Sequence, residues 1–141
     1  MIILDTNVVS EIFKPKPDPA AAGWLMAQPK ERCFLTAISK SELLFGLAGM
    51  PDGKRKRDLA DVMQAFFDVE LLNPVLAFEG SDAEHYADIA ASRKRIGRRI
   101  GELDTQIAAI ARRRGYSIAT RNVTVFEDCG VEIINPWEYS A

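Results

Sequence analysis

Three acidic residues, far apart in the chain, stand where they could do chemistry together. Asp5 ends the apolar run Ile2 to Leu4, Glu42 lies shortly after a second apolar run, and Asp104 precedes a run of small residues. Each alone also fits a structural role, because Asp and Glu are favoured as helix caps and in the first turn of a helix. If they meet in space, they repel one another and raise their own pKa values unless a cation neutralises them. Mg²⁺ or Mn²⁺ prefers such oxygen ligands, so the chemistry that we expect is phosphodiester cleavage by metal-activated water.

Short apolar runs predict the strands that would bring these acids together. Four of them are typical of buried parallel strands: Ile2 to Leu4, Cys33 to Thr36, Ser117 to Thr120 and Val131 to Ile134. The stretch Val69 to Pro74 is ambiguous, since it reads equally well as a short strand or as the end of a helix.

Helical patterns lie between the apolar runs. Pro19 follows a possible N-cap, Asp18, and Gly115 closes a helix predicted over Leu103 to Arg114. The other helical patterns are the stretch around Leu43 to Leu47, Lys54 to Asp68 and Ser81 to Ile96. Strands that alternate with helices indicate crossover connections, which place ligand sites beyond the carboxyl ends of the strands. The sequence thus predicts one domain over residues 1–141, with three α/β/α layers and a mainly parallel sheet of four or five strands.

Composition excludes several other kinds of protein. The chain has 141 residues, 48% apolar, with a formal net charge of -2, so it is not a wholesale basic nucleic-acid binder. Its 1 histidine argues against zinc sites and serine–histidine triads. We see neither a signal peptide nor an apolar run long enough to span a membrane, and we therefore expect a cytoplasmic protein.

Three segments together resemble the PIN-domain ribonucleases, and within them the VapC-type toxins of toxin–antitoxin pairs, including the FitB-like branch. They are "IILDTNVVSEIF", "LTAISKSELLFGL" and "IGELDTQIAAIARRRGYSIATRNVTVFEDCGVEIINPW". The resemblance runs from Met1 to Trp137. It implies a PIN-like fold and a magnesium-dependent endoribonuclease, with manganese as a possible substitute.

The resemblance also implies roles for individual residues. Asp5, Glu42 and Asp104 would be the catalytic, metal-binding acids. Asn122 occupies a fourth position where many relatives have Asp, and because it brings no charge it argues against a tightly bound second metal. Polar residues bordering the pocket would hydrogen-bond to carboxylates or water: Thr6, Asn7, Thr120 and Asn122.

Partners are implied in the same way. The substrate would be RNA. The basic run that leads into the Asp104 segment would flank the acidic pocket and contact RNA phosphates: Arg93, Lys94, Arg95, Arg98 and Arg99. A VapB-like antitoxin would lay its C-terminal segment across the active groove, and the chain would form a homodimer through the helices around Leu43 to Phe67. Apolar side chains in excess of a small core would supply these surfaces: Trp24, Leu25, Leu44, Phe45, Phe66 and Phe67.

One alternative from a different functional class remains open. A catalytically inactive PIN-fold module would bind RNA or a partner protein without cleaving it. Phosphate-binding loops fit less well, because the spacing from Gly49 to Gly53 is too short and Arg55 stands where Ser or Thr would hold magnesium. A haloacid-dehalogenase-like phosphatase needs a second Asp where this chain has Asn7.

Overall fold

A four-stranded parallel sheet forms the centre of the computed structural model, which describes residues 1–141. Its strands are β1 (Ile2–Leu4), β2 (Cys33–Phe34), β3 (Ser117–Ala119) and β4 (Ile133–Ile134), in the spatial order β2-β1-β3-β4. All neighbouring pairs are parallel. Every apolar run that predicted a strand therefore contains one, although three of the four strands are shorter than their runs.

The ambiguous stretch before Pro74 is not a strand. The chain there leaves the helix α4 (Lys54–Ala65) through a turn of π-helix, Phe66–Glu70, and then runs irregularly. A single parallel bridge, between Thr36 and Leu76, follows just after this stretch. The sheet thus has four strands, the lower of the two numbers expected.

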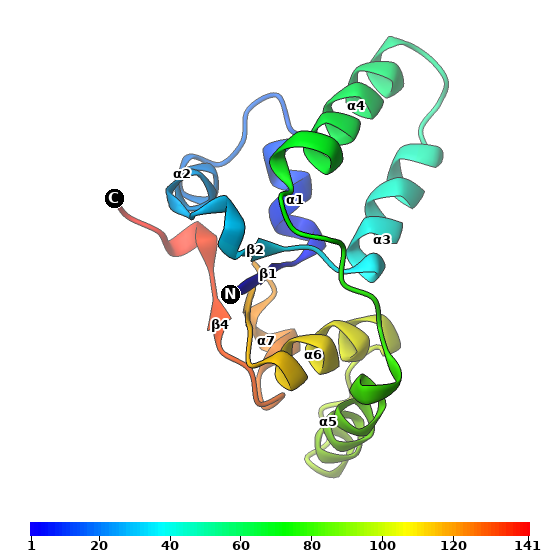
Figure 1. The fold of residues 1–141 in the computed structure, drawn as a ribbon, viewed down its shortest axis with the longest axis vertical. Coiled ribbons are helices and arrows are strands. Elements are labelled where there is room, and N and C mark those ends of the chain that lie inside the picture. The colour runs from blue at the N-terminus through cyan, green and yellow to red at the C-terminus, as the bar shows by residue number, and fades with distance from the viewer.

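Seven α-helices connect and cover the strands (Figure 1). They are α1 (Thr6–Ile12), α2 (Pro19–Ala27), α3 (Ala37–Ala48), α4 (Lys54–Ala65), α5 (Ala83–Arg95), α6 (Glu102–Arg114) and α7 (Val123–Phe126). Short 3₁₀ turns lie at Lys30–Arg32, Gly80–Asp82 and Pro136–Glu138.

Local sequence explains where the best-defined helices begin and end. Asp18 accepts hydrogen bonds from the backbone N–H groups of Ala20 and Ala21, and Pro19 occupies the first position of α2, as predicted. Gly115 ends α6 with φ of 70°, a left-handed conformation that glycine adopts without steric cost.

The core has two halves because side chains alternate along β1. Ile2 and Leu4 point into a cluster with residues of α1, α2, α3 and α4, whereas Ile3 points into a second cluster built on α6. This alternation produces the three-layer α/β/α arrangement that the sequence predicts. Trp24 and Phe66 are buried in the first cluster, so these two aromatic rings belong to the core and not to a binding surface.

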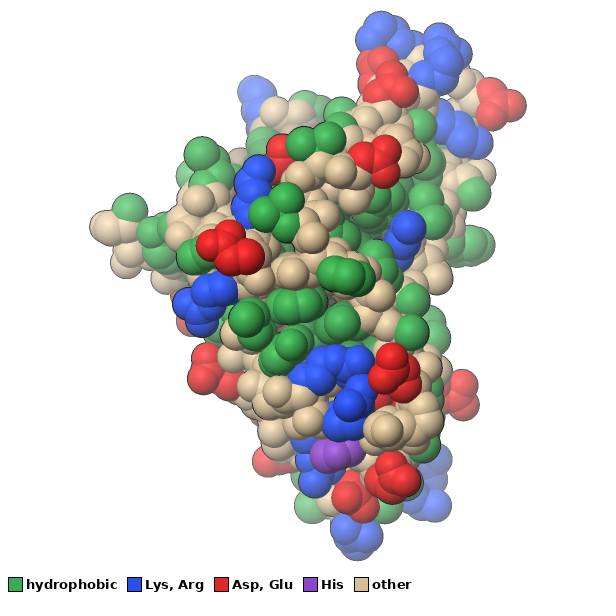
Figure 2. Space-filling view, viewed as in Figure 1, with side chains coloured by type: hydrophobic (Ala, Val, Ile, Leu, Met, Phe, Trp, Pro, Cys, Tyr) green, Lys and Arg blue, Asp and Glu red, His purple; other side chains and the backbone are tan.

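Helices α3 and α4 form a hairpin that projects beyond the sheet (Figure 1). Its tip carries the basic start of α4, the residues Lys54 to Arg57, and Figure 2 shows the resulting gathering of basic side chains at that end of the molecule. No helix is both long enough and apolar enough to cross a membrane.

Candidate active site

Asp5 lies at the carboxyl edge of the sheet and is the single residue between β1 and α1. It is the N-cap of α1, and its Oδ1 accepts a hydrogen bond of 2.8 Å from the backbone N–H of Thr6. Its Oδ2 accepts hydrogen bonds from the Thr120 hydroxyl at 2.8 Å and from the Asn7 amide at 3.2 Å. Three donors from two segments of the chain therefore orient the carboxylate. The residue is buried, with only 6% of its surface exposed.

Burial dominates the electrostatics of Asp5. It raises the pKa of the Asp5 carboxyl, while the hydrogen bonds from Thr120, Thr6 and Asn7 lower it without compensating fully. A buried carboxylate with a raised pKa and no basic partner is an arrangement that a cation would stabilise.

Glu42 approaches from α3. Thr36 caps that helix by accepting a hydrogen bond from the backbone N–H of Ser39. Glu42 lies three residues after Ser39, at an exposed position. The Thr6 hydroxyl donates to Glu42 Oε1 at 3.2 Å, which links α3 to the start of α1. Partial desolvation raises the pKa of Glu42 against the lowering effect of Thr6, and the charges of Asp5 and Asp104 raise it further.

Asp104 approaches from the other face of the sheet, in the first turn of α6. It is partly buried, and its carboxylate accepts no hydrogen bond from the rest of the chain. Burial raises the pKa of Asp104, and the charge of Asp5 raises it further. The charges of Asp5 and Asp104 thus act on Glu42, and the charge of Asp5 acts on Asp104. The three residues predicted from the sequence lie near one edge of the sheet, although their side chains stay apart.

The side chains of Asp5, Glu42 and Asp104 do not form a compact metal-binding cluster. No three His, Cys, Asp or Glu side chains lie close enough together to hold an ion. Carboxylates without a counter-ion repel one another, so separated rotamers are expected for them. The donor set consists of oxygen atoms only and fits a hard divalent cation in its chemistry. Its spacing requires the side chains of the exposed Glu42 and the partly buried Asp104 to rotate inward.

The polar residues expected around the pocket are found there in different ways. Thr6, Asn7 and Thr120 all contact the acids directly, and Thr120 is fully buried. Asn122 differs, because only its backbone N–H is engaged, donating to the Thr120 hydroxyl at 3.0 Å. Its exposed amide has no partner in the chain and is free to hold water.

The basic residues expected to contact RNA divide into two groups. Arg93 is only 4% exposed, and its guanidinium donates to the backbone carbonyls of Arg98, Val125 and Glu127. The expectation that Arg93 contacts RNA is therefore wrong, because a basic run on a helix does not reveal which member turns inward. Arg98 is held in ion pairs with acids after α7. The exposed members of the set are Lys94, Arg95 and Arg99.

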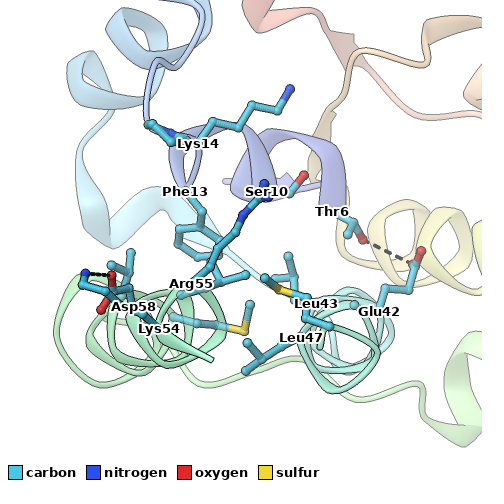
Figure 3. Close-up of a pocket in the computed structure, with 16 residues that line it drawn as sticks. Thr6, Ser10, Phe13, Lys14, Glu42, Leu43, Leu47, Lys54, Arg55 and Asp58 are labelled. Atoms are coloured by element: carbon cyan, nitrogen blue, oxygen red, sulfur yellow. Dashed lines mark hydrogen bonds and ion pairs between the residues drawn. The ribbon is translucent and has the colours of Figure 1, made fainter. Parts of the chain in front are cut away.

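A groove that sequence reasoning did not predict opens beside Glu42 (Figure 3). It has a volume of about 750 Å³ and lies between α1, α3 and α4. Its floor is apolar and includes Phe13, Leu43 and Leu47, while Lys14 and Arg55 stand at its rim. The apolar faces of α3 and α4 can be recognised in the sequence. The groove, however, depends on how the two helices pack in the hairpin that they form.

Comparison with known proteins identifies the family of the chain. The PIN domain family matches residues 2–128. The chain belongs to the PIN-domain family. This PIN domain is 44% identical to the VapC ribonuclease Y4jK of Sinorhizobium fredii over 98% of its own length and 99% of that protein. It is 34% identical to the toxin FitB of Neisseria gonorrhoeae over 97% of its length and 99% of FitB.

A solved structure extends the comparison to the fold. The PIN domain superimposes on a chain from the structure of FitAB bound to an IR36 DNA fragment with a TM-score of 0.93. The identity is 33%, and the match covers 100% of this chain and 99% of the other. The family and the three-layer fold predicted from the sequence are both confirmed.

Proposed function

We propose that this PIN domain is a VapC-like toxin, an endoribonuclease that depends on Mg²⁺ or Mn²⁺ and is neutralised by a VapB-like antitoxin. The observation that carries the proposal is the placement of Asp5, Glu42 and Asp104 near one sheet edge, at the N-cap of α1, in α3 and in the first turn of α6. The names of the relatives, a VapC ribonuclease and the toxin FitB, support it. We further propose that the protein acts in the cytoplasm, where it would meet RNA.

Asp5, Glu42 and Asp104 would hold the cation. When bound, such a cation supplies positive charge that neutralises the acids, activates a water as nucleophile and offsets charge on the scissile phosphate. A nearby divalent charge favours the ionised form of every carboxylate, so it would offset the burial and mutual repulsion that raise these pKa values. Asn122 in place of a fourth acid argues for one tightly held cation.

The neighbouring residues prepare Asp5 for this role. Thr120 and the backbone of Thr6 hold opposite oxygens of its carboxylate, so the group has one orientation. The Asn7 amide donates to Asp5 Oδ2, and its own oxygen accepts from the backbone N–H of Arg121 at 3.1 Å. That second bond determines which end of the Asn7 amide faces Asp5. Such outer hydrogen bonds orient a ligand before the cation arrives.

The groove beside Glu42 suits the antitoxin. Its apolar floor and basic rim fit an amphipathic segment whose apolar face lies on Phe13 and Leu47 and whose acidic residues meet Lys14 or Arg55. Because the groove also reaches Thr6 and Glu42, a segment bound there would end at the acids and block them. This proposal agrees with the solved relative, a complex named FitAB.

A homodimer remains part of the proposal. Within the stretch from Leu43 to Phe67, Leu44 is 43% exposed and Phe45 is 80% exposed. Large apolar side chains with this exposure on one helix are a feature of association surfaces. The dimer would therefore form through the outer face of α3.

The decisive experiment is cleavage of total RNA by the purified chain in Mg²⁺, with Asp5→Asn and Glu42→Gln as variants and a chelator as control. Both variants and the chelator should abolish cleavage, and product ends should map to defined sites. A folded Asp5→Asn protein that cuts at the wild-type rate would refute the assignment.

A catalytically inactive RNA- or protein-binding module is the second candidate. The separation of the acids and the neutral Asn122 favour it. In that case the wild-type protein would bind RNA or a partner protein, but it would leave RNA intact in both Mg²⁺ and Mn²⁺.

A further inference from the structure

Arg121 is an exposed cation at the end of β3, directly after Thr120. Its guanidinium carbon lies 5.3 Å from the centroid of the Trp137 ring, a stacked arrangement typical of cation–π contacts. The guanidinium makes no ion pair and donates no hydrogen bond within the chain, unlike Arg98 and Arg113. Arg121 therefore presents an oriented but unneutralised charge.

The backbone of Arg121 is tied to the catalytic edge. Its N–H donates to Asn7 Oδ1 at 3.1 Å, and the Asn7 amide in turn donates to Asp5 Oδ2 at 3.2 Å. The preceding residue, Thr120, contacts the same carboxylate oxygen. The position of Arg121 relative to the Asp5 carboxylate is thus set by two short chains of hydrogen bonds.

The guanidinium is held on the side of the sheet opposite to Asp104. Trp137 lies in the 3₁₀ turn after β4, which packs on α2, and its ring adjoins the core cluster of that face. Asp104 comes from α6, which covers the other face. A chain that crosses the sheet edge from the α6 side to the α2 side would pass Asp104, then Asp5, then Arg121.

Arg121 forms no ion pair with the acids of the site or with any other carboxylate of the chain, in contrast to Arg98 and Arg113. Its charge is therefore available to a ligand. Arg presents a planar fork of donors that matches phosphate geometry, and stacking on an aromatic ring orients that fork in advance.

We propose that Arg121, positioned by Trp137, binds a phosphate of single-stranded RNA next to the scissile bond. The inference rests on the ribonuclease function proposed above and assigns a substrate contact to a residue outside the basic run at Arg93 to Arg99. The substrate group is the phosphodiester backbone and not a base, so the contact contributes affinity without sequence preference.

The test measures binding of a fluorescent single-stranded oligoribonucleotide by anisotropy in the Glu42→Gln background, which prevents cleavage. Adding Arg121→Gln, which keeps a planar group over Trp137 but removes the charge, should weaken binding by about tenfold. The slope of log affinity against log salt should fall in magnitude by about 0.7, the value for one phosphate contact on a single strand. Arg121→Lys should preserve most of the slope.

Arg32 provides the matched control. It is also exposed and makes no side-chain hydrogen bond or ion pair, but it precedes β2 at the amino edge of the sheet. Arg32→Ala should leave both affinity and slope unchanged. In the otherwise wild-type chain, Arg121→Gln should raise KM and leave kcat nearly unchanged, because it removes a contact made equally in ground and transition states.

The outcomes separate this inference from the proposed function. If wild type cleaves RNA, Glu42→Gln does not, and a folded Arg121→Gln variant binds with unchanged affinity and slope, only the phosphate contact is refuted. If the wild-type chain neither cleaves nor binds RNA, both proposals fail. An equal loss of slope in Arg32→Ala also contradicts the inference, since it would show that any surface charge has the same effect.

Discussion

Replacing Thr120 by Val tests how the acidic site is held together. Thr120 is fully buried, and its hydroxyl joins three groups. It donates to Asp5 Oδ2 at 2.8 Å, and it accepts from the Asn7 amide at 3.3 Å and from the backbone N–H of Asn122 at 3.0 Å. Val has nearly the same shape but no hydroxyl, so the change removes these contacts and leaves the packing almost intact.

The expected cost follows from the nature of the lost bonds. A hydrogen bond to a charged group contributes about 1.5–3 kcal/mol, and the bond from Asn122 adds less because that residue is exposed and its N–H can meet water. We expect Thr120→Val to lower the free energy of unfolding by about 2–3 kcal/mol. For a domain of this size, Tm should fall by roughly 7–10 °C.

The same substitution should alter activity in a defined direction. Because the Thr120 hydrogen bond lowers the pKa of Asp5 against the effect of burial, its removal raises that pKa further. If cleavage requires ionised Asp5, the acid limb of the pH profile for kcat/KM should move to higher pH. Thr120→Ser, which keeps the hydroxyl and loses a methyl group, should cost about 1 kcal/mol and leave the acid limb in place.

Thermal unfolding in chelator and pH profiles of RNA cleavage provide the two measurements. A Thr120→Val protein with wild-type Tm and an unchanged acid limb would refute the reasoning. So would a Thr120→Ser protein that shifts the acid limb as far as Thr120→Val, since that would assign the effect to the methyl group.

Three further predictions concern other charged groups. Burial and the charge of Asp5 raise the pKa of Asp104, so its contribution to stability is greatest below the usual aspartate pKa and is lost as pH rises through the folded value. In chelator at pH 7, Asp104→Asn should therefore be more stable than wild type by up to about 1 kcal/mol and should unfold at a higher temperature. Arg93→Met should cost about 3 kcal/mol, since three backbone carbonyls lose their donor, and hydrogen exchange should rise around α7. Burial alone would raise the pKa of Asp82, but the hydrogen bond from Arg113 and neighbouring charges hold that pKa below its usual value. Asp82→Asn should lower the free energy of unfolding by about 2–3 kcal/mol at pH 7. Denaturant unfolding should show a smaller loss as pH falls through the lowered pKa.

Sequence patterns predicted the architecture because its determinants are local. Buried strands such as Ile2–Leu4 are continuous apolar runs, and Asp18, Pro19 and Gly115 mark helix ends by their own conformational preferences. The placement of the three acids followed from the parallel topology. Asp5 comes directly after β1, while Glu42 and Asp104 lie in the early turns of α3 and α6, and in such a fold these helix starts lie at the same edge as the strand ends.

The parts that were missed depend on packing between distant segments. Whether Arg93 or Arg95 faces inward is decided in part by the carbonyls of Val125, within α7, and of Glu127, just after it, which lie more than thirty positions later in the chain. The groove beside Glu42 exists only because α3 and α4 fold into a hairpin, and the stacking of Arg121 on Trp137 joins the ends of β3 and β4. No periodicity in the sequence encodes contacts of this kind.

The most direct test of the central claim is a Mn²⁺ titration of the metal-free protein, followed by calorimetry or electron paramagnetic resonance, for wild type and for the variants Asp5→Asn, Glu42→Gln and Asp104→Asn. If the three acids act as one site, wild type binds one Mn²⁺ tightly and each variant loses most of that affinity while remaining folded. Binding of equal affinity in wild type and in any one of the three variants would contradict the account, because that acid would then take no part in holding the cation.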